Sequence, residues 1–142
     1  MVSIEKLLLI MTNPSISFAE KYLVEDGFIL NNCIEGSDIW AKTLKMDKAE
    51  TISLMKLDGI YNSISYLFFD ENTYKVILED AINKFDFKYL EDDEAKILEK
   101  DGLILLLIRH EQTPFKIFSV KLGRKNKDNE IIEVIMHPPK SQ

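Results

Sequence analysis

Residues 103–108 read LILLLI, and this six-residue apolar run constrains the fold more than any other part of the chain. It follows Asp101-Gly102, a pair that is typical of tight turns because both residues tolerate a positive φ. The run is far shorter than the roughly 20 residues that a membrane-spanning helix needs. An all-apolar strand is usually buried on both of its faces. We therefore expect residues 103–108 to form a strand in the interior of a sheet.

Apolar residues that alternate with polar ones predict the rest of this sheet. From residue 28 onward the period is two, through residues 39–46 and again through residues 51–57 and 60–69. Asp58-Gly59 is the strongest hairpin signal in the chain and joins the last two of these runs. Further strands are predicted to start at residues 87–89 and to span 115–122 and 130–136, with a polar loop at 123–129 between the last two. Trp40 is expected to be partly buried, with its indole N–H hydrogen-bonded or at the margin of the sheet.

Apolar residues at spacings of three and four predict three helices. The first spans residues 4–11 behind a Ser3 cap, although a strand remains an alternative because residues 7–11 are continuously apolar. The second begins at Pro14, or at Ser17 in a capping-box spacing with Glu20, and ends at Gly27 in the left-handed conformation. The third is capped by Asp70. Its apolar face is formed by Tyr74, Ile77, Leu78, Ala81, Ile82 and Phe85.

These patterns predict an α+β fold, in which a mostly antiparallel sheet carries about three helices packed mainly on one face. A helix, a turn and antiparallel strands follow one another twice, across residues 14–69 and 71–136. The two stretches share few aligned residues, so the repeat is topological. No shift in composition divides the 142 residues. We expect a single α+β domain over residues 1–136 and a flexible tail over 137–142, where Pro138-Pro139 prevents strand pairing.

Composition indicates the cellular compartment in which we expect the protein and the classes of partner that it is expected to bind. Cys33 is the single cysteine, so no intrachain disulfide can form, and the reducing cytoplasm is the expected location. We expect Cys33 to be a partly buried apolar side chain. The apolar residues 7–11 are too short for a signal peptide. The net charge of −6 argues against nucleic acid as the primary partner, because phosphate binding depends on clustered Lys and Arg. We expect no membrane partner.

The chain carries little that resembles catalytic equipment. Two histidines and one cysteine cannot supply the usual zinc site. Glycine-rich nucleotide motifs and the G-x-S-x-G nucleophile motif do not occur. His110 beside Glu111 is the one place for a general base, but adjacent residues on a strand point to opposite faces. We therefore predict no catalytic residues, no metal and no cofactor, and a protein that is not an enzyme.

Charge is distributed unevenly along the second half of the chain. Residues 86–101 contain seven acids against three lysines, and residues 116–127 contain five basic residues and no acid. Solvated turns explain most runs of this kind, and a docking surface is the alternative. The candidate residues for binding another protein are Glu91, Asp92, Asp93, Glu94, Glu99 and Asp101. The candidates for binding an anion are Lys121, Arg124, Lys125, Lys127 and His110.

Two functional hypotheses follow from these residues. The first is a non-catalytic binding module of the immunity or antitoxin kind, which neutralises a basic toxin by direct contact through its acids. The second is a small enzyme or ligand-binding protein that acts on a phosphorylated or acidic compound, with the lysines and Arg124 as anion ligands and His110 as acid or base. A module that assembles with itself through exposed apolar strand surface is a third possibility.

Overall fold

The computed structural model describes residues 2–13, 15–34, 36–45, 48–57, 60–111 and 116–124. Within these residues, three helices and eight strands make up an α+β fold, as the sequence predicts. In chain order they are α1 (Ile4–Thr12), α2 (Ile16–Glu25), β1 (Ile29–Ile34), β2 (Ser37–Lys45), β3 (Lys48–Leu57), β4 (Ile60–Phe68), α3 (Glu71–Asn83), β5 (Lys88–Asp92), β6 (Ala95–Lys100), β7 (Leu103–His110) and β8 (Ile117–Arg124).

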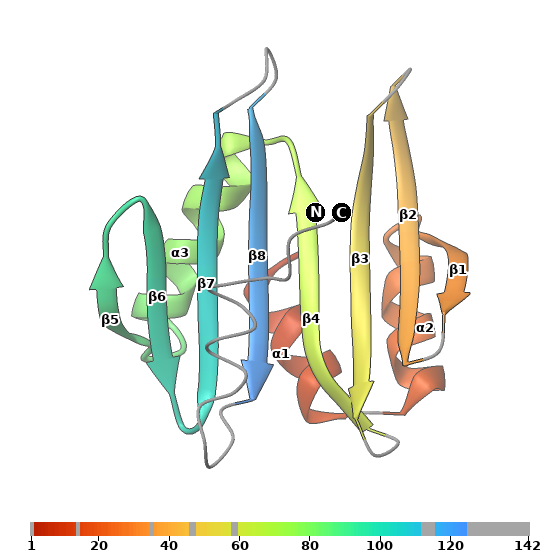
Figure 1. The fold of residues 1–142 in the computed structure, drawn as a ribbon, viewed down its shortest axis with the longest axis horizontal. Helices are drawn as coiled ribbons and strands as arrows, with labels where there is room; N and C mark the ends of the chain where they lie inside the picture. Colours follow the sequence, from red (N-terminus) through yellow and green to blue (C-terminus); the bar gives the residue numbers. More distant parts are fainter. Residues whose placement is uncertain are drawn as a thin grey trace.

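The strands form one antiparallel sheet in the order β1-β2-β3-β4-β8-β7-β6-β5 (Figure 1). This order reads as two four-strand meanders, β1–β4 and β5–β8, whose last strands pair with each other. The two edges of the sheet are therefore the first strand of each meander. Tyr66 of β4 lies opposite Val120 of β8 near the middle of the pairing between the two halves.

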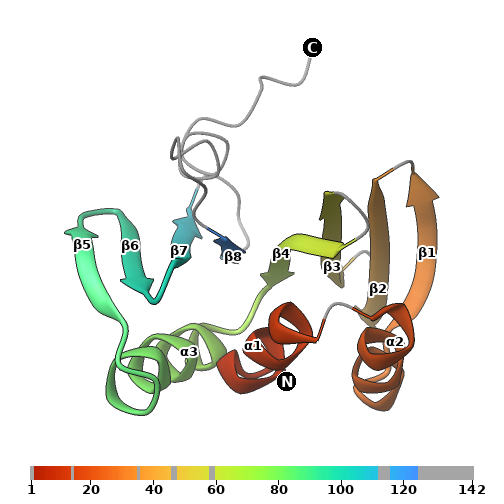
Figure 2. The same cartoon turned by 90° about the horizontal axis from the view of Figure 1, so that it is seen from below.

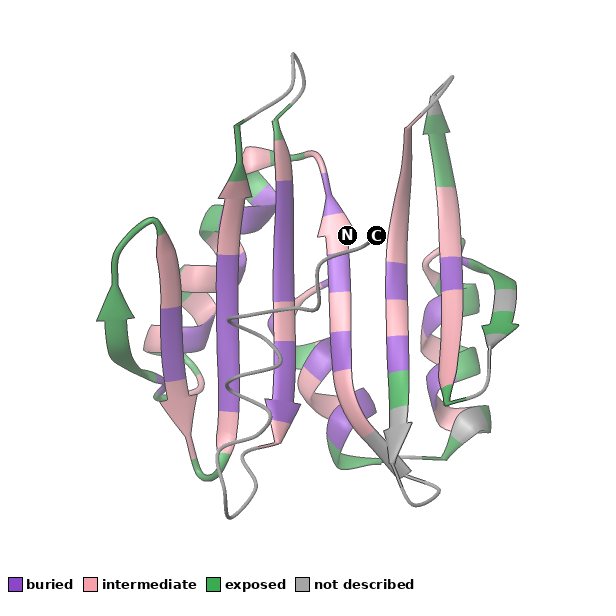
Figure 3. Ribbon diagram, in the orientation of Figure 1, coloured by how far each residue is buried: buried purple, intermediate pink, exposed green. Residues whose placement is uncertain are grey.

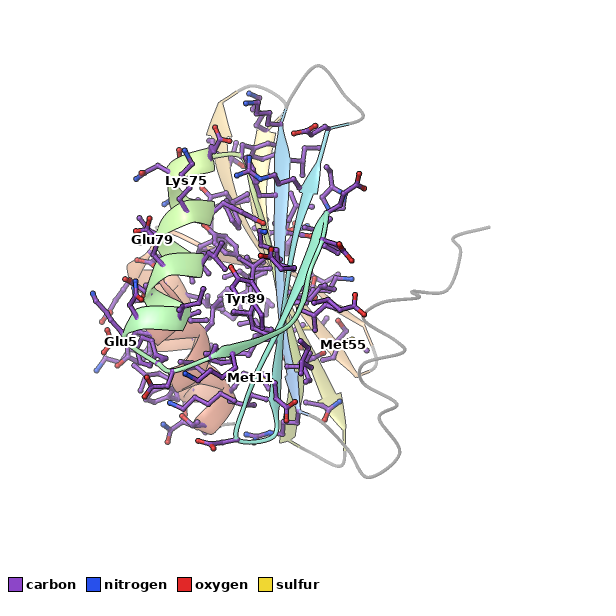
Figure 4. All side chains as sticks on the ribbon, turned by 90° about the vertical axis from the view of Figure 1, so that its left-hand side faces the viewer. Glu5, Met11, Met55, Lys75, Glu79 and Tyr89 are labelled. Atoms are coloured by element: carbon purple, nitrogen blue, oxygen red, sulfur yellow. The ribbon has the colours of Figure 1, made fainter. Side chains whose placement is uncertain are left out.

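All three helices lie on one face of the sheet (Figure 2). Their apolar sides pack against alternate residues of the strands and form the main core, which includes Leu7 of α1, Leu23 of α2, Ile77 of α3 and Trp40 of β2. The outer side of α3 carries Lys75 and Glu79, which point away from the sheet, and Met55 lies on the opposite face of the sheet from the helices (Figure 4). We call that opposite face the open face.

Capping side chains fix where each helix begins. Ser3 accepts a hydrogen bond from the Lys6 amide, which settles the choice between helix and strand at residues 4–11 in favour of the helix. Asp70 caps α3 as predicted. The prediction of a Ser17 cap for α2 is wrong. Ser15 is the cap, because its hydroxyl accepts from the Phe18 amide.

In both halves, a residue with a positive φ and then a buried phenylalanine connect the helix to the first strand of the meander. After α2, Gly27 takes a φ of 89° and Phe28 is buried; after α3, Asp86 takes a φ of 59° and Phe87 is buried. The predicted left-handed termination at Gly27 is therefore confirmed. A β-bulge follows in each edge strand, after Leu30 in β1 and after Tyr89 in β5. The repeat that the sequence hints at thus exists in the order of elements.

Strand β7 is buried on both faces, as its sequence predicts (Figure 3). Leu105 and Leu107 face the helices and belong to the main core. Ile104 and Leu106 face the open side and form a second buried cluster with Ile97 of β6, packed by Ala95 and Ile108. The strand lies third from the edge, between β8 and β6.

The structure confirms some of the other sequence predictions and contradicts others. Leu57 pairs with Ile60, as the predicted hairpin requires, although Asp58 and Gly59 themselves lie outside the described residues. The loop predicted to start at residue 123 is wrong at its first two positions, because β8 continues through Arg124. Cys33 is exposed on the edge strand β1 and is not partly buried. The strand predicted over 130–136 and the tail over 137–142 lie outside the described residues.

Candidate functional site

Strand β5 forms one edge of the described sheet, and its sequence is Lys-Tyr-Leu-Glu-Asp. All five residues are exposed, and β6 is the one strand among the described residues to which β5 is hydrogen-bonded. Tyr89 and Leu90 are 42% and 51% exposed, so the strand presents apolar surface beside its acids. An edge strand of this kind offers both free backbone groups and apolar surface to another molecule.

Four acids gather where β5 turns into β6. We call Glu91, Asp92, Asp93 and Glu94 the acidic tip, and all four are exposed. Glu91 lies on the open face opposite Ile97, whereas Asp92 lies on the other face opposite Lys96. The ammonium of Lys96 donates a hydrogen bond to Asp92, and this contact raises the pKa of Lys96. Asp92 is thus partly neutralised within the hairpin, and Glu91, Asp93 and Glu94 carry most of the available negative charge.

The other two predicted protein-binding residues do not join this cluster. Glu99 lies opposite Lys88 on the open face, and Asp101 occupies the β6–β7 turn with a φ of 48°. The β6 strand separates that turn from the acidic tip, a span of about 17 Å at about 3.3 Å per residue. The acidic stretch of the sequence therefore becomes two separate acidic spots on one edge of the sheet.

The predicted anion-binding residues are also divided. Lys121 and His110 lie on the open face of β8 and β7, since they pair with Leu106 and Ile117. Arg124 lies on the helix side, opposite Leu103, and donates a hydrogen bond to the carbonyl oxygen of Met11 in α1. Lys125 and Lys127 lie outside the described residues. Arg124 thus holds α1 on the sheet and is not available to an anion beside Lys121.

A hydrogen bond of 3.0 Å joins His110 Nε2 to the hydroxyl of Ser119. A hydroxyl beside an imidazole is the first requirement of nucleophilic catalysis, and a third group that orients the imidazole is the second. Among the described residues, none is hydrogen-bonded to the other ring nitrogen of His110. Ser119 is only 7% exposed. The pair by itself is therefore a cross-strand contact between β7 and β8.

One charged cluster escaped sequence reasoning. Arg109 of β7 bonds Glu71 of α3 at 2.5 Å, and its guanidinium lies 4.6 Å from the ring centre of Tyr74. Lys116 approaches the same carboxylate at 3.7 Å. The hydrogen bond from Arg109, followed by the charge of Lys116, lowers the pKa of Glu71, and the same hydrogen bond raises the pKa of Arg109. The cluster ties the start of α3 to the sheet. Its only sequence signal was an acid in the first turn of a helix.

A second polar cluster lies under β2–β4. The hydroxyl of Tyr66 donates a hydrogen bond to Glu50, and burial together with this contact raises the pKa of Tyr66. Lys6 of α1 pairs with Asp26 at the end of α2 at 2.8 Å. Trp40 is 5% exposed, which is deeper than predicted, and its indole N–H has no hydrogen-bond partner among the described residues. The first contact links β4 to β3 within the sheet, and the second links α1 to the end of α2.

Within the described part of the chain, no three His, Cys, Asp or Glu side chains converge as metal ligands. No helix in that part is both long and apolar enough to cross a membrane. No protein-family model, curated protein or solved structure matches the chain. The acidic tip, together with the exposed Tyr89 and Leu90 beside it, is the strongest candidate functional site.

Proposed function

We propose that this protein is a non-catalytic binding module of the immunity or antitoxin kind, which neutralises a basic toxin by direct contact. The observation that carries the proposal is the β5 edge, where exposed apolar side chains stand directly beside exposed acids. Interfaces typically combine an apolar or aromatic anchor with a charged rim. On this edge, Tyr89 and Leu90 are the anchors and Glu91, Asp93 and Glu94 are the rim.

The shape of the acidic tip favours a protein over a metal ion as its partner. Glu91 and Asp92 lie on opposite faces of the sheet, and Asp93 and Glu94 occupy the turn beyond them. A metal ion needs oxygens that converge within about 2.0–2.6 Å of one point. Carboxylates that diverge can instead meet basic groups spread across a cleft. Toxins that cleave nucleic acids are basic because their substrates are polyanions, so an acidic inhibitor is attracted to the same cleft.

The proposal is tested by capturing a partner and measuring how fast it binds. The immobilised protein is exposed to an extract of its native host, and the captured protein is identified by mass spectrometry and purified. We expect a basic protein that is toxic when it is expressed alone. Its association rate constant should fall at least about tenfold in the variant Asp93→Lys/Glu94→Lys, because electrostatic steering is lost. Raising the salt from 0.1 M to 1 M should slow the wild type similarly, since the Debye length falls from about 10 Å to about 3 Å.

The matched control is Glu20→Lys/Glu25→Lys, which changes the net charge equally on α2, beneath the opposite end of the sheet (Figure 2). It should bind at nearly the wild-type rate. Both double variants should keep nearly the wild-type melting temperature, because all four side chains are exposed. An association rate that responds neither to salt nor to Asp93→Lys/Glu94→Lys would contradict the proposal.

The runner-up function is binding or conversion of an anionic compound on the open face. It is favoured by one observation, the placement of Lys121, Ser119 and His110 on the same side of β7 and β8. The variant His110→Ala separates the two functions. A binding module is indifferent to this change, whereas a protein that acts on a phosphorylated compound loses activity and loses any thermal stabilisation by inorganic phosphate.

A further inference from the structure

Strand β1, the edge strand at the opposite end of the sheet, contains no charged residue. Its sequence is Ile-Leu-Asn-Asn-Cys-Ile, whereas three of the five residues of β5 are charged. Monomeric proteins protect their edge strands with charges, prolines or bulges, because a free edge pairs readily with another strand. Both edge strands carry a bulge, so the bulge does not distinguish them. The difference in charge does.

Exposed apolar side chains gather at the same edge. Ile29 is 73% exposed, Val24 at the end of α2 is 60% exposed and Leu30 is 41% exposed. Ile29 lies opposite Ala41 on the open face, and Leu30 lies opposite Trp40 on the helix face. The edge is therefore apolar on both of its faces, and a strand added beside β1 would cover apolar surface on each side of the sheet.

We propose that a second copy of this chain pairs with β1. The two β1 strands run antiparallel about a two-fold axis and join the two sheets into one. In an antiparallel two-fold pairing, residue i of one strand meets residue j of the other and j meets i, so only residues near the middle of the strand meet their own copy. An uncharged strand meets no like charge in this arrangement, and the free backbone groups of both edges become hydrogen-bonded. The β5 edge is less suited to an apolar contact of this kind, because three of its five residues are charged.

The first test is the concentration dependence of the mass in sedimentation equilibrium. We expect the wild type to dimerise. Asn31→Lys places a charge near the middle of β1, where the two copies meet, and should weaken the dimer at least about tenfold. Ile29→Lys is the second variant and should weaken it as well. Both side chains are exposed, so neither change should unfold the protein. Leu90→Lys puts the same charge on the β5 edge and is the matched control, which should leave the dimer unchanged.

The second test locates the interface through Cys33, the only cysteine, which lies exposed on β1. A spin label on this thiol gives the distance between the two copies. Pairing through a strand of six residues places the two labelled positions within about 20 Å, apart from the reach of the labels. The strands β1 and β5 are separated by seven inter-strand spacings, about 34 Å. A dimer formed through β5 would therefore place the labels roughly 70 Å apart.

A monomer at all concentrations up to about 100 µM, well above the micromolar range of a weak specific interface, overturns the proposal. So does a dimer that resists Asn31→Lys and Ile29→Lys, one that is disrupted by Leu90→Lys, or one whose labels are separated by the longer distance. A dimer that is weakened by both β1 variants and shows the short distance supports it.

Discussion

In the N-terminal half, α2 leads through Gly27 and the buried Phe28 into the meander β1–β4. In the C-terminal half, α3 leads through Asp86 and the buried Phe87 into the meander β5–β8. The residues that face the helices keep the same character in both halves. Ile52 of β3 is completely buried, as is its counterpart Leu105 of β7. The two halves are thus most alike on the side of each strand that contacts the helices.

The outward-facing residues of the two halves differ. On the open face, β3 presents Thr51 and Ser53, which are half-buried, whereas β7 presents the buried Ile104 and Leu106. The edges differ in the same way, since β1 is neutral and β5 is acidic. The two halves thus share one arrangement of elements and differ in the surfaces that they present. The two edges are therefore suited to different partners.

The largest expected effect tests whether the two halves fold as one unit. Phe118 of β8 is buried and stacks on Phe68 of β4, across the pairing between the halves. Phe118→Ala should cost about 3–5 kcal/mol of unfolding free energy, because it leaves a cavity in the core. Urea unfolding is followed by circular dichroism and by the fluorescence of Trp40, the single tryptophan, which lies in the N-terminal half.

Both signals should shift together to lower urea, since a single cooperative unit unfolds in one transition. Tyr89→Ala on the exposed β5 strand is the control and should change the stability only slightly. If the Trp40 transition stayed at its wild-type midpoint while the circular dichroism shifted, the halves would be independent units.

A smaller effect distinguishes the two residues with a positive φ that follow α2 and α3. Gly27 has a φ of 89°, and a Cβ added there would lie 3.5 Å from the side chain of Lys42, an ordinary contact. Gly27→Ala should therefore cost about 1–2 kcal/mol through backbone strain alone. Asp86→Gly should change the stability by less than about 1 kcal/mol, because glycine accepts the same conformation without strain. Thermal and urea unfolding measure both, and equal losses for the two variants would argue against the difference.

The smallest effect concerns the acid that anchors α3 and has no counterpart in the first turn of α2. The pKa of Glu71 is lowered in the folded state by the hydrogen bond from Arg109. The ionised carboxylate therefore stabilises the fold above the unfolded-state pKa, near 4.5, and this contribution is lost as the pH falls through the folded-state pKa. The melting temperature of the wild type should exceed that of Glu71→Gln at pH 7, and the gap should close toward pH 3.

Glu79→Gln is the control for this measurement, since it removes a carboxylate from the outward side of α3 (Figure 4). It should show no comparable closing gap in acid. A gap for Glu71→Gln that stayed constant between pH 7 and pH 3 would mean that the ion pair with Arg109 contributes nothing to stability.

Local signals predicted most of the fold. The period-two runs, the Asp101-Gly102 turn and the caps at Ser3 and Asp70 depend on residues that are close in sequence, so the sequence contains them directly. The sequence pattern predicted Pro14 or Ser17 as the start of α2 and missed the Ser15 cap, because serines at either position can cap a helix. Only the orientation of the first turn determines which hydroxyl reaches the Phe18 amide.

The candidate site was only partly predictable, because charge counted along a chain ignores pairing across strands. The acidic tip was found as a stretch of acids, but its partial neutralisation depends on Lys96 lying opposite Asp92. Arg124 belonged to the basic stretch, yet its partner is a carbonyl oxygen 113 residues away in sequence. Neither contact leaves a local pattern. The neutral edge at β1 was missed for another reason: the absence of charge becomes informative only once the strand is known to be an edge.

The strand order also determines when each part of the sheet can form during synthesis. Strand β4 is complete by Phe68, but β8, its neighbour in the sheet, begins only at Ile117. During synthesis at about 5–20 residues per second, the inner edge of β4 stays without its partner for seconds. The two meanders form from local contacts, whereas joining them closes a loop of nearly 50 residues and is the slow step. A chaperone that shields β4 during this interval would raise the yield of folded protein more than one that acts on either outer edge.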